Sequence, residues 1–127
     1  MDNDTDLVEC CSRRLWTAEC ERVPTEPLTK AFPALDRATA YAIQRATFRR
    51  RGAALAGFKL GGTVRPPPGS DRRSYGRLSV AHRIAEAEQA VDPRRFLDPC
   101  VEPEIALRLA RELGGEGHTR ESVAAHL

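Results

Sequence analysis

The chain has 127 residues, enough for one ordinary domain with a modest core. Its 20 basic residues nearly balance its 18 acidic residues, so the sequence predicts no strong attraction to nucleic acid or to a membrane surface. No apolar run approaches the roughly 20 residues that a membrane-spanning helix needs, and the acidic start at Met1–Asp4 lacks the features of a signal peptide. We therefore expect a cytoplasmic protein.

Two helices are predicted in the first 52 residues. The first covers residues 4–22, where apolar residues recur at helical spacing, and residues 23–27 then form a linker with two prolines. The second begins at Pro33 and Asp36, where the aspartate can cap the free backbone amides, and it stops at Gly52.

A short strand is predicted over residues 53–63, because a short apolar run with glycines is typical of a strand that leads into a tight turn. Lys59 is embedded in this run between Phe58 and Leu60. A lysine in an apolar pocket has a lowered pKa, which suits proton transfer or anion binding. The alternative is a strand lysine that faces solvent, and the local sequence by itself favours it.

Beyond this strand the sequence predicts mainly irregular structure. Residues 65–71 contain three consecutive prolines and form a loop. Tyr75–Gly76 is typical of a turn with an aromatic anchor, and the alanine- and glutamate-rich segment 84–91 favours a helix. Thr119 is the expected N-cap of a last short helix. The four cysteines lack the paired spacing of a zinc site, so we interpret them as free thiols.

Two structures compete for the segment 101–113. Its composition favours a helix, whereas the alternation of apolar residues with Glu102 and Glu104, and the presence of Pro103, favour a strand. On a strand, residues two apart point to the same face, so the two carboxylates would converge on one hard cation such as Mg²⁺. On a helix they would point to roughly opposite sides and form no shared site. The residues alone leave this choice open.

Six fragments of the chain follow one another in the order and approximate spacing of one known family. They are Pro27–Thr29, Pro33–Asp36, Ala40–Gln44, Gly57–Thr63, Tyr75–Leu78 and Pro99–Ala106. Together they resemble the N-terminal half of the 2-keto-4-pentenoate hydratase / 2-oxo-hepta-3-ene-1,7-dioate hydratase family, in the fumarylacetoacetate hydrolase superfamily. The resemblance implies an α+β fold, with an N-terminal helical region (1–52) followed by the first strands of an incomplete, β-rich catalytic roll (53–127).

The resemblance also implies a site. It places the glutamate pair on a strand, where Glu102 and Glu104 bind Mg²⁺ or Mn²⁺. The other implied site residues are the catalytic Lys59 and the substrate-binding Gly61, Thr63 and Tyr75. The implied reaction is the addition of water to a 2-hydroxydienoate, or 2-keto-4-enoate, in the meta-cleavage catabolism of aromatic compounds. The implied partners are a small 2-keto acid and either a second copy of the chain or a full-length family member.

The chain also departs from the family's pattern. Family members are considerably longer, and the third carboxylate ligand that follows their glutamate pair is absent here. Val64 stands in place of a common serine, and Ser74 in place of an acidic residue. An interrupted sheet would expose strand edges and apolar surface, which favours association with a partner.

Three alternatives to an active hydratase therefore stay open. One is a catalytically inactive remnant or partner subunit of the family. Another is the related 2-oxo-3-enedioate (4-oxalocrotonate) decarboxylase, which uses the same metal-bound dienolate and loses CO₂. The third is a small helical regulator without a metal, which requires residues 101–113 to be helical.

Overall fold

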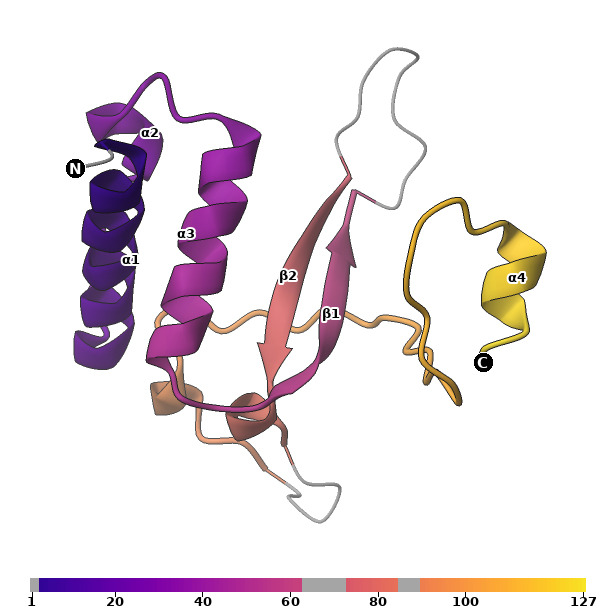
Figure 1. The fold of residues 1–127 in the computed structure, drawn as a ribbon. Coiled ribbons are helices and arrows are strands. Elements are labelled where there is room, and N and C mark those ends of the chain that lie inside the picture. Colours follow the sequence, from indigo (N-terminus) through magenta and orange to yellow (C-terminus); the bar gives the residue numbers. More distant parts are fainter. Residues whose placement is uncertain (1–2, 63–72, 85–89) are drawn as a thin grey trace. The chain divides into compact units, whose positions relative to one another are not determined.

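The computed structural model describes residues 3–62, 73–84 and 90–127 (Figure 1). The chain divides into two compact units, residues 1–97 and 98–127, and each unit is described here by itself. The described residues form helices and one two-stranded antiparallel sheet. This combination confirms the predicted α+β class.

Both predicted N-terminal helices are present in the first unit. The first is α1 (Asn3–Glu21), and the second is α3 (Arg37–Arg50). Asp36 caps α3 as predicted, because its carboxylate accepts a hydrogen bond of 2.7 Å from the backbone N–H of Thr39. A short helix between them, α2 (Leu28–Ala31), was not predicted, since four residues are too few to show helical periodicity.

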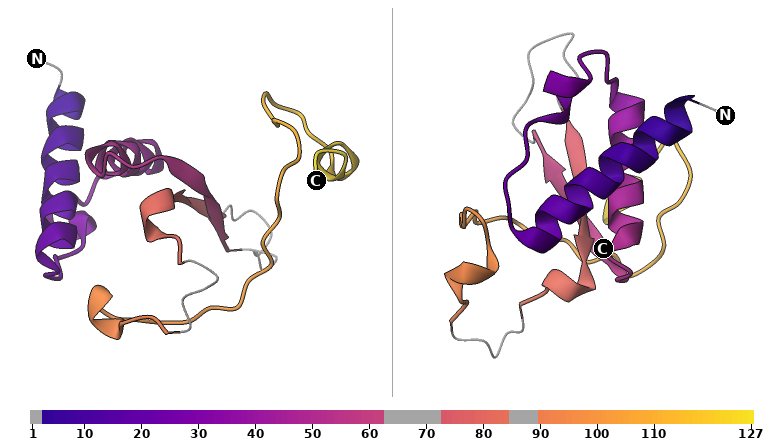
Figure 2. Two further views of the ribbon diagram at one scale, coloured as in Figure 1. Left: turned by 90° about the horizontal axis from the view of Figure 1, so that it is seen from below. Right: turned by 90° about the vertical axis from the view of Figure 1, so that its left-hand side faces the viewer.

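The core of the first unit lies between α1 and α3, which cross obliquely (Figure 2). Its buried apolar residues among those described are Cys11, Ile43 and Ala46. Polar contacts join the same two helices: the guanidinium of Arg50 donates to the hydroxyl of the buried Ser12 at 3.1 Å. Arg51 pairs with Glu19 at 2.7 Å. All four cysteines are free thiols, as predicted.

The two long helices end on residues with left-handed backbone. Gly52, the predicted stop of α3, has φ = +63°, and Arg22, just after α1, has φ = +54°. The N–H of Val23 donates to the carbonyl of Ala18 at 3.0 Å, and the N–H of Arg22 donates to that of Glu19 at 3.3 Å. These two bonds define a Schellman motif, in which glycine is the preferred residue at the position that Arg22 occupies.

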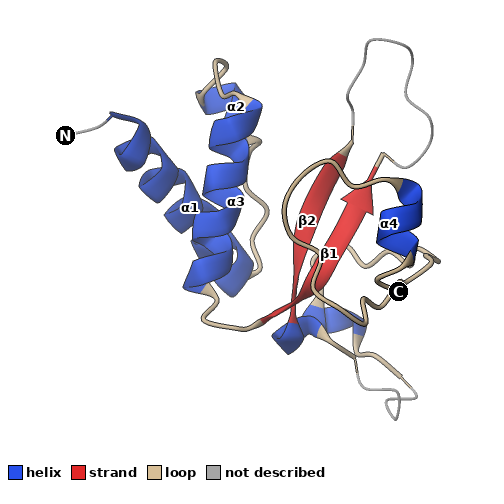
Figure 3. Cartoon of the chain, turned by 45° about the vertical axis from the view of Figure 1, so that its right-hand side comes forward, coloured by secondary structure: helices blue, strands red, loops and turns tan. Residues whose placement is uncertain are grey.

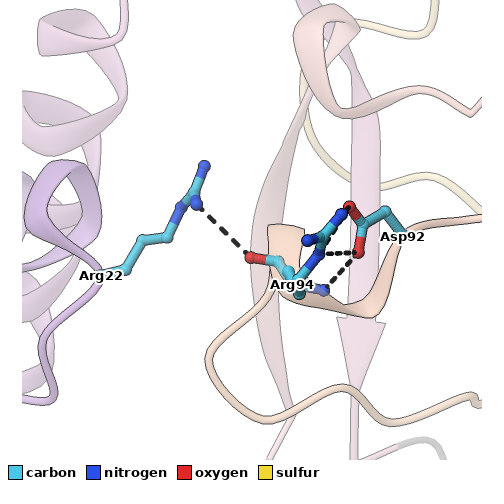
Figure 4. A network of polar contacts seen from close by, with 3 residues as sticks. All are labelled: Arg22, Asp92 and Arg94. Carbon is cyan, nitrogen blue, oxygen red and sulfur yellow. Dashed lines mark hydrogen bonds and ion pairs between the residues drawn. The ribbon is translucent and has the colours of Figure 1, made fainter.

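The side chain of Arg22 reaches a second part of the same unit (Figure 4). It donates to the backbone carbonyl of Arg94 at 3.4 Å, in the short 3₁₀ helix η2 (Pro93–Arg95). Asp92 caps that helix, and the guanidinium and backbone N–H of Arg94 hydrogen-bond to the Asp92 carboxylate at 2.8 and 2.9 Å. These bonds hold the pKa of Asp92 below its ordinary value of 3.8.

The predicted strand is present as β1 (Leu55–Gly61), which pairs with an antiparallel strand β2 (Ser74–Ser79). Our prediction of a turn at Tyr75–Gly76 was wrong, because both residues lie within β2 and Gly76 stands directly opposite Lys59. A glycine after an aromatic residue is typical of a turn, but the pairing with β1 determines the backbone here. A 3₁₀ helix, η1 (Val80–His82), follows β2 directly.

Some predictions fall on parts of the chain outside the described residues. They are the loop at residues 65–71, the substrate-binding Thr63, and most of the helix at residues 84–91, of which only residues 84, 90 and 91 are described. Those three residues are not helical. Within the described ranges, no helix combines the length and the apolar composition needed to span a membrane.

The second unit contains one helix, α4 (Arg120–Ala124), and long loop segments (Figure 3). Thr119 caps α4 as predicted, in a capping box with Ser122. Residues 98–109 are neither helix nor strand, so the expected strand at the glutamate pair was wrong, and so was the alternative helix. A strand forms when its backbone groups pair with a neighbour, and no described residue forms such a pair with this segment.

Candidate functional site

Three of the residues that the sequence assigned to a site line one cleft in the first unit. They are Lys59 and Gly61 of β1 and Tyr75 of β2. The cleft has a volume of about 620 Å³, and α3 supplies its other wall through Arg37, Tyr41 and Gln44. Arg73 and Ser74, at the start of β2, also line it. The cleft therefore lies where one helix meets one end of a β-hairpin.

Tyr75 is held in the cleft by two side chains of α3. The hydroxyl of Tyr41 accepts a hydrogen bond of 3.3 Å from the backbone N–H of Tyr75, and the amide of Gln44 donates one of 3.0 Å to its carbonyl. Because Tyr41 and Gln44 are three residues apart, they lie on the same face of the helix. The rings of Phe58 and Tyr75 form a T-shaped contact, with 5.8 Å between centroids. Side chains of α3 are thus hydrogen-bonded to the backbone of β2 at Tyr75.

The amide of Gln44 leaves an acceptor without a partner. Its nitrogen must donate to the Tyr75 carbonyl, which fixes the orientation of the amide. The remaining Oε1 atom is buried and has no hydrogen-bond partner in the described structure. A buried acceptor without a donor is costly, so this contact reduces the stability of the junction between α3 and β2.

Lys59 is half-buried and surrounded by glycines on its face of the hairpin. Residues two apart on a strand share a face, so its neighbours there are Gly57 and Gly61, and Gly76 stands opposite it. The apolar neighbours that the sequence placed around Lys59, Phe58 among them, belong to the other face by the same rule. The described neighbours of Lys59 on its own face are therefore glycines and not the predicted apolar side chains.

Gly61 has a packing reason to be glycine. A Cβ atom added at this position would lie 2.7 Å from the hydroxyl oxygen of Ser74, closer than non-bonded atoms approach. The backbone carbonyl of Ser74 lies at an ordinary 3.8 Å, so a side chain at residue 61 would displace the Ser74 hydroxyl and not the strand.

Positive charge gathers around this cleft. Arg37, Lys59 and Arg73 line it, and its described lining contains no carboxylate. The guanidinium of Arg37 lies 5.7 Å from the centre of the Tyr41 ring and donates a hydrogen bond to the backbone carbonyl of Arg73. Cationic side chains of this kind bind carboxylates and stabilise oxyanions.

Four lining residues with polar side chains, Arg37, Tyr41, Gln44 and Arg73, were not predicted as site residues, although part of their signal is visible in the sequence. Tyr41 and Gln44 lie in a fragment that resembles the family, yet we interpreted that fragment only as a helix face. Arg37 and Arg73 were unremarkable surface arginines in the sequence, because nothing local indicates that they lie close together. They are 36 residues apart and are joined only by tertiary structure.

The predicted metal ligands belong to the second unit. Glu102 and Glu104 are exposed and lie in the segment that is neither helix nor strand. Carboxylate oxygens are suitable ligands for Mg²⁺ or Mn²⁺. However, the part of the chain that the structure describes contains no group of three or more histidine, cysteine, aspartate or glutamate side chains placed to hold a metal. The pair therefore has the right chemistry but is by itself an incomplete ligand set.

Comparison with known proteins gives relatives of one kind. The chain is 32% identical over 125 residues to 2-keto-4-pentenoate hydratase 2 of Dechloromonas aromatica (strain RCB), an alignment that covers 94% of this chain and 47% of that protein. It is 32% identical over 123 residues to the 2-keto-4-pentenoate hydratase of Paraburkholderia phymatum and 31% identical over 123 residues to that of Burkholderia vietnamiensis. Both alignments cover 92% of this chain and 47% of the relative.

No family model matches the chain, and no solved structure matches it significantly. The chain spans about half the length of the curated relatives that it matches. The alignments run through the fragments that line the cleft and through the glutamate pair, since they cover nearly all of this chain. The chain is therefore a relative of the 2-keto-4-pentenoate hydratases, similar to them over nearly its whole length and over about half of theirs.

Proposed function

We propose that this chain forms the substrate cleft of a 2-keto-4-pentenoate hydratase, a hydro-lyase of aromatic meta-cleavage catabolism in the cytoplasm. The observation that carries the proposal is the presence of Lys59, Gly61 and Tyr75 in one cleft. The names of the relatives support the same reaction. In this proposal residues 1–52 are the N-terminal helical region, and residues 53–127 begin a fumarylacetoacetate-hydrolase-like roll.

The reaction defines what the cleft has to do. A 2-hydroxydienoate loses its enol proton and gains a proton at the distal carbon, C5. The oxygen of water then bonds to C4, and C3 takes up a proton, so that one water molecule is added in total. Negative charge develops on the C2 oxygen when the enol proton leaves. An ammonium group at Lys59 stabilises that oxygen and holds a proton that it can exchange with it.

Two further groups of the cleft have assigned roles. The carbonyl and N–H of Tyr75 are bonded to α3 and its ring stacks on that of Tyr41, so we assign Tyr75 to holding the wall of the cleft that α3 and β2 form. Gln44 is fixed by its hydrogen bond to the Tyr75 carbonyl, so we assign it to positioning the same wall. We assign Gly61 to the substrate-binding lining of the cleft, opposite Ser74.

The metal is part of the proposal as well. We assign Glu102 and Glu104 to two ligand positions of Mg²⁺ or Mn²⁺, and the others to water, substrate or further protein groups. Such an ion supplies Lewis acidity to a 2-keto acid. Because two carboxylates hold Mg²⁺ only weakly, we expect weak metal binding and little or no turnover from the 127-residue chain alone.

Binding of a substrate analogue tests the cleft directly. We expect 2-oxopentanoate to bind the chain, measured by chemical-shift titration, and Lys59→Met to abolish that binding. Lys30→Met is the matched control, because Lys30 is an exposed lysine of α2 outside the cleft that pairs with Glu26. Absence of binding, or equal binding by Lys59→Met, would contradict the proposal.

A parallel absorbance assay on 2-hydroxypenta-2,4-dienoate with Mn²⁺ measures turnover, and a rate comparable to a full-length hydratase would contradict the incomplete metal site.

A second candidate function, a non-catalytic partner subunit, is favoured by the exposed apolar residues of the second unit. Val101 is 93% exposed and Ile105 is 92% exposed, which is unusual for large apolar side chains. Such a subunit would associate with a second copy or with a full-length family member. Size-exclusion chromatography of the chain and of a Val101→Ser/Ile105→Ser variant tests the partner-subunit function. Association of the natural chain that the variant loses supports that function.

The decarboxylase alternative predicts CO₂ release from a 2-oxo-3-enedioate.

A further inference from the structure

A second cavity, of about 330 Å³, lies in the first unit among α1, α2, α3 and β2. Its lining is mostly apolar and includes Leu15, Leu28, Leu35, Ile43 and Phe48. Protein sites that hold small molecules are mostly apolar and have volumes of roughly 300–1,000 Å³. The second cavity shares a wall with the candidate cleft, since Ala40, Gln44 and Gly76 line both. Lys59 and Tyr75 line the cleft alone.

Two arginines line the second cavity, and they differ in their partners. Arg51 pairs with the carboxylate of Glu19 at 2.7 Å. The guanidinium of Arg77 instead lies over two aromatic rings, 5.9 Å from the centre of Phe48 and 5.5 Å from the centre of Phe58. Its Nε atom is buried and has no hydrogen-bond partner in the described structure. The described contacts of this cation are therefore with rings and not with a carboxylate.

A cation in this position favours an anionic ligand. Arg77 is half-buried, and burial of a charge costs free energy unless a counter-charge pairs with it. The two aromatic rings offset part of that cost, because their faces are electron-rich. A carboxylate offsets more of it, since the planar fork of a guanidinium matches the two carboxylate oxygens. The buried Nε atom leaves the terminal Nη groups of Arg77 to make this contact.

We infer that the second cavity binds an alkyl carboxylate. The carboxylate pairs with the guanidinium of Arg77, and the alkyl chain packs against the leucines and Ile43 of the lining. Such a ligand has neither a keto group nor a double bond, so it is not a substrate of the proposed reaction. The site is thus additional to the hydratase cleft, and it does not depend on the proposed function.

Three small probes test the two halves of this ligand. Hexanoate and hexan-1-ol have the same alkyl chain and differ in charge, and we expect hexanoate to bind about tenfold more tightly, the effect of a charge-assisted contact. Butanoate has the same charge and two fewer CH₂ groups. It should bind more weakly than hexanoate, by about fourfold for each CH₂ that the apolar lining no longer buries. Chemical-shift titration at pH 7 measures the three affinities.

The same titration locates the site without any substitution. Hexanoate should shift the backbone amide signals of Phe48 and Arg77, which line the second cavity, and leave that of Gly61, which lines the cleft alone. The reverse pattern would place the carboxylate in the cleft and would overturn the inference.

Variants assign the charge preference to one arginine. Arg77→Met removes the charge and keeps a long side chain beside Phe48, so we expect it to lower the affinity for hexanoate to that for hexan-1-ol. Arg83→Gln is the matched control, since Arg83 is an exposed arginine that lines neither cavity. Lys59→Met should also bind hexanoate like the natural chain, because Lys59 belongs to the cleft. Circular dichroism checks that each variant is folded.

The outcomes separate this site from the proposed function. Equal affinity for hexanoate and hexan-1-ol, or an unchanged preference in Arg77→Met, would overturn the inference and leave the hydratase cleft as proposed. Loss of hexanoate binding in Lys59→Met would overturn it as well. Failure of 2-oxopentanoate to bind contradicts the proposed function and not this site. A preference for hexanoate that is lost in Arg77→Met and kept in Arg83→Gln and Lys59→Met establishes the inference.

Discussion

The rings of Tyr41 and Tyr75 stack with their centroids 4.5 Å apart and their planes inclined by 11°. The same Tyr41 hydroxyl accepts the backbone N–H of Tyr75 at 3.3 Å. One helical residue therefore contacts both the ring and the backbone of a strand residue 34 positions later in the chain. Because Tyr75 forms a wall of the cleft, this contact between α3 and β2 sets the geometry of the candidate site.

Removal of the Tyr41 hydroxyl tests that contact. Tyr41→Phe keeps the ring and loses the acceptor, so we expect a loss of about 1 kcal/mol in the free energy of unfolding. Tyr41→Ala also loses the half-buried ring and should cost about 2–3 kcal/mol. Urea denaturation followed by circular dichroism measures both values. If Tyr41→Phe is as stable as the natural chain, water replaces the hydroxyl and the bond contributes nothing.

Acid should destabilise the first unit through Asp36. The hydrogen bonds from Thr39 hold the pKa of this carboxyl below its ordinary value of 3.8. The folded state therefore binds this proton less tightly than the unfolded state, so the stabilisation is present above that ordinary value and is lost as the pH falls through the lowered pKa.

The variant Asp36→Asn tests the pH dependence, because asparagine caps a helix without titrating. Its melting temperature should change less than that of the natural chain between about pH 6 and about pH 3. Asp98→Asn is a suitable control, since in the described chain residue 98 precedes no helix directly. Identical pH profiles for the natural chain and Asp36→Asn would show that the cap does not contribute to acid sensitivity.

Glycine should stabilise the end of α1. Arg22 occupies the left-handed position of the Schellman motif, with φ = +54°, where a Cβ atom is strained. Arg22→Gly and Arg22→Ala both lose the contact with the Arg94 carbonyl. The difference between their unfolding free energies therefore reports only the backbone strain at this position. We expect the glycine variant to exceed the alanine variant by about 1 kcal/mol in unfolding free energy. Equal stability would mean that the helix end relaxes in the alanine variant.

The glutamate pair makes a prediction that does not depend on turnover. If Glu102 and Glu104 hold a divalent ion, Glu102→Gln and Glu104→Gln should each abolish the weak Mn²⁺ binding of the chain, because each removes a charged ligand from a pair. Electron paramagnetic resonance of free Mn²⁺ measures the binding. Glu116→Gln, in the same unit, should bind like the natural chain. Unchanged affinity in both ligand variants would remove the pair from the proposed site.

Part of the candidate site could be predicted because its signals are local. Lys59 and Gly61 stood in a short apolar run with glycines, which predicts a strand, and β1 is present there. The environment of Lys59 could not be predicted in the same way. Its sequence neighbours point to the other face of β1, and the residue opposite it, Gly76, comes from β2.

The sequence by itself determined α1, α3 and α4 and the caps of α3 and α4. Asp36 and Thr119 cap helices that begin at the next residue, and Gly52 ends α3, because caps and helical periodicity act over a few residues. Tertiary structure alone decided that Tyr75 lies in a strand, and that Arg37 and Arg73 meet at one cleft. It also left the segment of the glutamate pair without a strand, since a strand depends on a partner that is distant in the chain and local propensity cannot supply one.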